Sequence, residues 1–110
     1  MKVLSLIAVL LALMTMQAQV TANAQYQDPA RHGRQLVGKF CSSCHAVARF
    51  GRGPNRNAPP FRTLGRKFDL DGFPGMLERG ISSTHPDMPV VKFSQDDARD
   101  VVVYLRSIQR

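Results

Sequence analysis

The chain has 110 residues, enough for a single domain, and its 15 Lys and Arg residues against eight Asp and Glu give a net charge of +7. It contains no Gly-rich phosphate loop and no carboxylate pair near a nucleophile, so the sequence offers no catalytic constellation. The net positive charge alone would suit binding to nucleic acid or to an acidic protein. The N-terminal segment helps to decide between these two classes of partner.

Residues 1–24 have the layout of a secretory signal peptide. Lys2 supplies a positive start, residues 3–14 contain a single polar residue, and residues 22–24 form a small-x-small pattern. The alternative is a retained membrane anchor, but the apolar run is shorter than the roughly 20 residues that span a bilayer. The segment therefore predicts export to the periplasm, which argues against nucleic acid as a partner.

We expect cleavage after Ala24, with Ala22 and Ala18 as alternative positions. The mature domain would then span residues 25–110, which is 86 residues; losing Lys2 leaves 14 Lys and Arg against eight Asp and Glu, a net charge of +6. A core of this size leaves folding only marginally favourable, and such chains often depend on a disulfide, a metal or a cofactor.

The first helix of the mature domain is predicted to begin at Asp28 and Pro29, because Asp is a favourable N-cap and Pro a favourable first helical residue. Apolar or small residues then recur at three- and four-residue spacing, as on one face of a helix. They are Ala30, Gly33, Leu36, Val37 and Phe40. The helix runs into Cys41.

Residues 45–61 are rich in Gly, Pro, Asn and Arg, which predicts a loop. Basic residues gather from this loop onward with no acid between them: Arg49, Arg52, Arg56, Arg62, Arg66 and Lys67. This basic segment is either a positive face that steers an acidic partner protein or a solvated surface that keeps a small protein soluble. Short helices are predicted over 61–68 and 73–80, and a second loop over 82–93.

The last helix is predicted to begin after Ser94, an N-cap residue with Asp97 three residues on, close to a capping box. Its apolar stripe comprises Ala98, Val101, Val102, Leu105 and Ile108. No segment alternates convincingly as a strand, so the predicted fold class is all-α.

The sequence Cys41-Ser42-Ser43-Cys44-His45 is a C-x-x-C-H motif, the signature of covalent haem attachment. Two Cys about one helical turn apart can each form a thioether to one of the two vinyl groups of haem. His45 then falls under the iron and can ligate it. The motif predicts one covalently attached haem c, held by Cys41 and Cys44 with His45 as iron ligand.

Three other roles for the two Cys were weighed. A disulfide is compatible with export, but it would close a very short loop and stabilise little. A thioredoxin-like redox pair needs a βαβ setting, which the sequence does not predict. A structural zinc site usually needs four N or S ligands, and His32 and His85 are not spaced as a second pair.

The second axial position of the iron has two main candidates. Of the two Met in the mature domain, Met76 lies in a predicted helix and suits a core role, whereas Met88 lies in a polar loop with no apolar stripe to join. Ligation of the haem iron would explain why an apolar Met occurs in this polar loop. His85, three residues earlier, is the nearest rival, and His32 is disfavoured because it lies beside the stripe of the first helix.

The mature sequence resembles the small bacterial class I cytochromes c. Beyond the attachment motif, Gly33 matches the family's Gly at the crossing of the first and last helices. Tyr104-Leu105 matches the aromatic-Leu pair at that crossing, and Met88-Pro89 matches the loop of the distal ligand. Pro59-Pro60 resembles the Pro segment whose backbone carbonyl accepts the second ring N–H of the ligating His.

The resemblance implies the cytochrome c fold, His45 and Met88 as axial ligands, and Pro59 or Pro60 as the acceptor beside His45. It implies single-electron transfer between redox partner proteins rather than enzymatic catalysis. Two alternatives stay open: a dedicated cytochrome subunit of a periplasmic oxidoreductase, and a five-coordinate haem sensor or enzyme. No Trp is present to bond a haem propionate, which leaves Arg62, Arg66, Tyr side chains or water for that role.

Overall fold

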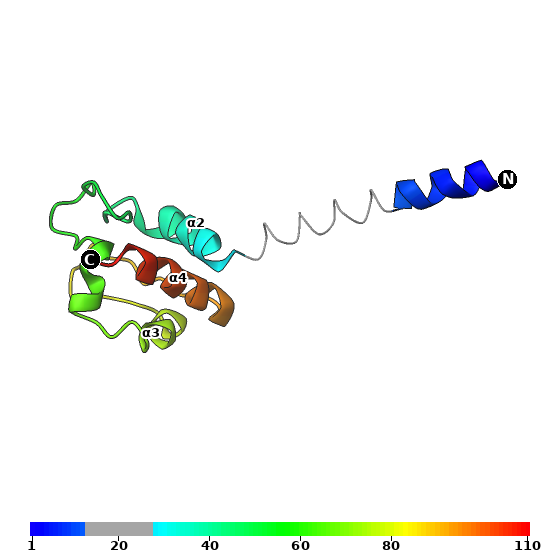
Figure 1. Ribbon diagram of the computed structural model, residues 1–110. Helices are drawn as coiled ribbons and strands as arrows, with labels where there is room; N and C mark the ends of the chain where they lie inside the picture. The colour runs from blue at the N-terminus through cyan, green and yellow to red at the C-terminus, as the bar shows by residue number, and fades with distance from the viewer. Residues whose placement is uncertain (13–27) are drawn as a thin grey trace.

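A computed structural model describes residues 1–12 and 28–110 of the chain. Residues 2–12 form the blue helix in Figure 1. Their apolar side chains are exposed. The expected cleavage site after Ala24 lies outside the described residues. None of the helices in the described ranges has the length and apolar character needed to cross a membrane.

The domain consists of three α-helices and one 3₁₀ helix (Figure 1). These are α2 (Pro29–Cys41), η1 (Phe61–Arg66), α3 (Phe73–Arg79) and α4 (Gln95–Ile108). Across residues 28–110 no strand forms, and an isolated antiparallel bridge joins Ile81 to Val91. The all-α prediction is therefore confirmed, although the segment predicted as a helix over 61–68 is a shorter 3₁₀ helix.

Both long helices begin at the residues that the sequence predicted. The Asp28 carboxylate accepts hydrogen bonds from the backbone N–H of Ala30 and Arg31, at 3.1 and 3.2 Å. The Ser94 hydroxyl accepts one from the backbone N–H of Asp97 at 3.2 Å. These contacts satisfy N–H groups that have no partner within the helix, so each cap stabilises its helix by about 1 kcal/mol.

Helices α2 and α4 cross in direct backbone contact at Gly33. A Cβ atom at this position would lie 2.0 Å from the carbonyl oxygen of Asp100, so only glycine allows this approach. Next to the crossing, Nδ1 of His32 lies 2.7 Å from Oδ2 of Asp100 and Nε2 lies 3.7 Å from Oδ1 of Asp97. The crossing therefore combines close packing with polar contacts between the first turns of the two helices.

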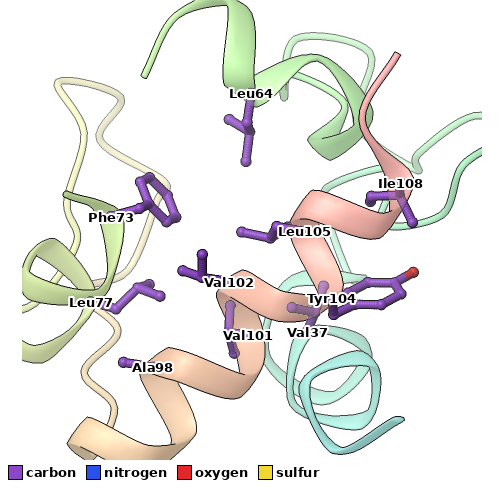
Figure 2. Close-up of a cluster of buried hydrophobic side chains, with 10 residues drawn as sticks. All are labelled: Val37, Leu64, Phe73, Leu77, Ala98, Val101, Val102, Tyr104, Leu105 and Ile108. Carbon is purple, nitrogen blue, oxygen red and sulfur yellow. The ribbon is translucent and has the colours of Figure 1, made fainter. Parts of the chain in front are cut away.

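One core holds the domain together, and α4 supplies most of it (Figure 2). Its members are Val37, Leu64, Phe73, Leu77, Ala98, Val101, Val102, Tyr104, Leu105 and Ile108. The Tyr104 ring is buried beside Val37, and its hydroxyl donates a hydrogen bond to the carbonyl of Val47 at 2.8 Å. Each buried Val, Leu, Ile or Phe side chain contributes about 1.5–3 kcal/mol through removal of apolar surface from water.

Candidate functional site

A cavity of about 250 Å³ opens between the end of α2, residues 55–61, α3 and residues 81–93. Six of the ten core side chains form its inner wall: Val37, Leu64, Phe73, Leu77, Val101 and Leu105. The rest of the lining includes polar residues and partly exposed apolar side chains, among them Phe40 and Phe68. The core is therefore hollow on one side, and a flat apolar group would complete it.

The attachment motif lies at the edge of this cavity because α2 ends there. Cys41 is the last residue of α2, and its carbonyl accepts hydrogen bonds from the backbone N–H of Cys44 (3.3 Å) and of His45 (3.0 Å). This turn brings both Cys and His45 to one cavity wall. The two Cys do not form a disulfide with each other.

Burial raises the pKa of the Cys41 thiol from 9.0 to about 11, because desolvation disfavours the thiolate. Among the described residues, no three His, Cys, Asp or Glu side chains gather where they could hold a metal ion. Residues 28–110 form no strand, so the βαβ setting that a thioredoxin-like pair needs is not found in this part of the chain.

The imidazole of His45 is fixed by two neighbours. Its Nδ1 lies 2.8 Å from the carbonyl oxygen of Pro59, and its ring centre lies 4.7 Å from that of Phe61. A carbonyl can only accept, so Nδ1 carries the proton and Nε2 is left with its lone pair free. This is the tautomer that a metal-ligating His requires.

The structure distinguishes the two Pro that the sequence left as alternatives. The Pro59 carbonyl is the acceptor for His45, whereas the Pro60 carbonyl lies near the backbone N–H and hydroxyl of Thr63, at 3.3 and 3.0 Å. Pro60 is the residue before η1 and directs the chain into that helix. The two residues therefore have different partners.

Met88, His85 and Met76 all line the cavity. The backbone N–H of Met88 donates to the carbonyl of His85 at 3.1 Å, which closes a turn. Nδ1 of His85 lies 3.4 Å from the backbone N of Asp87, and the His85 side chain is 50% exposed. Met76 packs partly buried against the core. Of these two Met residues, only Met76 is packed against the core, whereas Met88 is not.

The two arginines considered for haem propionates do not line this cavity. Arg62 instead donates from Nη1 to the carbonyl of Gly51 at 3.0 Å. The polar groups that do line the cavity include Asn55 and Asn57. Nothing in the sequence marked these Asn residues, because Asn in a Gly- and Pro-rich loop is ordinary turn chemistry.

The all-α fold, the attachment motif at the end of a helix and the apolar cavity together define a c-type cytochrome. The chain is 30% identical over 80 residues to a protein named cytochrome c-552 from Bradyrhizobium diazoefficiens. These 80 aligned residues cover 73% of this chain and 75% of that protein. No family model matches the chain, and no solved structure matches it. With this relative, the chain belongs to the small bacterial class I cytochromes c.

The cofactor of this family is covalently bound haem c, whose iron gains and loses one electron. The residues of this chain fit it. Two thiols stand on one cavity wall, an imidazole beside them has its second nitrogen held by a carbonyl, and the cavity wall is largely apolar. The protein is therefore an electron-transfer cytochrome.

Proposed function

We propose that the protein is a soluble periplasmic carrier that passes single electrons between redox proteins, with its haem held by Cys41 and Cys44 and ligated by His45 and Met88. The observation that carries the proposal is the His45 imidazole, which lines the cavity with its Nδ1 held by Pro59. That hydrogen bond orients the ring and raises its basicity as a ligand.

Met88 as the second ligand is supported by its place in the cavity lining and by the turn that connects it to His85. If His45 and Met88 both ligated the iron, it would have no position left for oxygen or a substrate, which would suit a carrier better than a sensor or enzyme. The fixed residues around the cavity would limit reorganisation during electron exchange.

The experiment replaces each cavity Met in the ferric holoprotein. Met88→Ala should abolish the weak long-wavelength absorption band that Met ligation gives a ferric haem, and should lower the reduction potential because a sulfur ligand favours the ferrous state. The matched control is Met76→Ala, which should keep the band. An unchanged band in Met88→Ala would refute this ligand. If His85 were the ligand instead, the unsubstituted holoprotein would already lack the band, and His85→Ala, but not Met88→Ala, would change the haem spectrum.

Docking by the basic segment (residues 49–67) is supported by its charge. Its six basic residues form no ion pair within the described part of the chain. Acidic residues lie instead at the N-cap of α2 (Asp28) and in the first turn of α4 (Asp96 and Asp97). These two helices begin at the other end of the domain (Figure 1). A partner with an acidic surface would be steered toward the positive end.

A dedicated subunit of an oxidoreductase is the second candidate. Large apolar side chains that are exposed and do not line the haem cavity include Phe50, Val90 and Val103, which come from three different segments. Scattered apolar residues are ordinary on soluble proteins, so they favour the free carrier. Size-exclusion chromatography of the native protein tests this choice, because a larger co-eluting chain would support the subunit.

Export is proposed from residues 1–24. Mass spectrometry and N-terminal sequencing of the native protein should find a chain beginning at Gln25 in the periplasmic fraction. A chain that retains residues 2–12 would contradict signal cleavage.

A further inference from the structure

A second hollow, of about 360 Å³, lies over the loop that follows His45. Three arginines line it: Arg52, Arg56 and Arg62. Its remaining lining is made of small residues, Pro60 and Asn55, and no acidic side chain takes part. The hollow therefore combines a concave shape with positive charge.

The loop under this hollow is rigidly built. A Cβ at Gly53 would lie 2.4 Å from the backbone N of Ala46, so the chain folds back onto itself at this residue. The backbone N–H of Asn55 donates to the carbonyl of Cys44 at 3.1 Å, and that of Phe61 donates to the carbonyl of Ala46 at 2.9 Å. The arginines on this loop consequently project from a fixed backbone, which lowers the entropy lost when they bind a ligand.

Most of the hydrogen-bond donors of Arg62 are unused. Its Nη1 donates to the carbonyl of Gly51, which holds the side chain across the loop. A guanidinium has five N–H donors, and this bond occupies one. Within the described residues, Arg52 and Arg56 form neither an ion pair nor a side-chain hydrogen bond.

The charge around the hollow is also uncompensated in the sequence. No Asp or Glu occurs between His45 and Phe68. Arginine forks match the oxygens of a tetrahedral anion and bind them with short, charge-assisted hydrogen bonds. We propose that Arg52, Arg56 and Arg62 form a binding site for a small tetrahedral dianion of the phosphate type.

The three arginines also belong to the basic segment proposed to dock a redox partner, but phosphate binding can be tested without that partner. Free phosphate is favoured over a lipid headgroup because a phosphodiester carries one negative charge, whereas the three arginines offer three positive ones. Inorganic phosphate is therefore the probe, and vesicles of an anionic phospholipid are the comparison.

The experiment follows backbone amide signals of the ferrous holoprotein during titration with inorganic phosphate, at mildly alkaline pH and at an ionic strength held constant with chloride. Saturable shifts are expected in residues 51–56 and at Arg62. Arg52→Gln and Arg56→Gln should each weaken phosphate binding about tenfold, the loss of one charge-assisted contact.

Arg49→Gln is the matched control, since Arg49 belongs to the same basic segment but does not line the hollow. It should change the affinity by less than about twofold, as expected for a screened surface charge. Equal weakening by Arg49→Gln, or shifts that do not saturate, would show general charge attraction and overturn the site. Shifts seen with vesicles and not with free phosphate would overturn it as well.

The haem absorption spectrum of each variant shows whether its fold is retained. Should an Arg→Gln variant fail to fold, Arg56→Lys replaces it, because lysine keeps the charge and loses the fork. Undiminished phosphate affinity in Arg56→Lys would then contradict a role of the guanidinium. If Met88 proves not to be the iron ligand, the phosphate experiments can still be interpreted. They measure phosphate binding and do not depend on which residue ligates the iron.

Discussion

At the scale of single residues, the attachment motif could be predicted from the sequence because its function is local. Cys41, Cys44 and His45 lie within five residues, so their spacing alone brings them together. The acceptor for His45 could only be narrowed to Pro59 or Pro60, because it depends on how a loop of 14 residues folds back. The structure identifies Pro59 through a distance of 2.8 Å.

Phe61 was missed as a neighbour of His45 for the same reason. Its ring lies 4.7 Å from the imidazole only because its backbone N–H is bonded to the carbonyl of Ala46. A single Phe at the start of a predicted helix carries no signal of such a contact. Long-range packing beside a motif is therefore what the sequence could not specify.

Gly33→Ala is expected to destabilise the protein by about 1–3 kcal/mol or more, because the new Cβ would overlap the carbonyl of Asp100 and force α2 away from α4. Denaturant unfolding of the holoprotein measures the change. Gly38→Ala is the matched control on the same helix, since a Cβ there meets no atom within 4 Å. It should stabilise by about 0.5–1 kcal/mol through helix propensity. Equal effects of the two substitutions would contradict the close crossing.

At the scale of elements, helix beginnings were predicted well and helix ends less well. Asp28 and Ser94 are caps that act within three residues, so the sequence reports them directly. The segment over 61–68 was predicted as a short helix, but it forms a 3₁₀ helix that ends at Arg66. Its end depends on contacts with the C-terminus, which no local pattern reveals.

Gln109 makes that contact. Its Nε2 donates to the carbonyls of Phe61 (2.9 Å) and Leu105 (2.7 Å), and its Oε1 accepts from the backbone N–H of Gly65 at 2.8 Å. One side chain thus joins both ends of η1 to the end of α4. No local pattern marks this role, because a Gln that follows the apolar stripe of a helix is ordinarily solvated.

Gln109→Leu is expected to cost about 1–3 kcal/mol of unfolding free energy, since it leaves three backbone groups without their partner. Gln109→Glu keeps the acceptor and should recover part of this loss. Thermal unfolding of the holoprotein checks both, with Gln35→Leu as the control at an exposed position of α2. If Gln35→Leu lowered the unfolding free energy as much as Gln109→Leu, the proposed role of the Gln109 hydrogen bonds would be contradicted.

At the scale of the whole molecule, charge is divided along the domain. The basic segment lies near the end of α4, opposite the end of the domain at which α2 and α4 begin (Figure 1). Asp97 and Asp100 belong to the beginning of α4 and contact His32 of α2. The net charge could be read from the sequence, but the separation of the charges depends on α2 and α4 beginning at the same end. The result is an electric dipole along the domain.

Electron transfer to an acidic partner is therefore expected to slow by about tenfold or more between low and physiological ionic strength, as screening removes the steering. Stopped-flow kinetics over a salt series measures this. Arg66→Glu should slow the reaction at low salt more than Arg34→Glu, which places the same charge change on α2. Equal slowing by the two variants would mean that net charge, and not the basic segment, guides the encounter.

The cavity in the core has a further consequence for how the protein comes into being. Six of the ten core side chains border this cavity, so the polypeptide by itself cannot fill the middle of its hydrophobic core. Cys41→Ser together with Cys44→Ser should accordingly yield a chain with little cooperative unfolding, measurable by circular dichroism. Covalent attachment would thus be the maturation step that commits the chain to its native state, and a molecule that misses it would be left open to proteolysis.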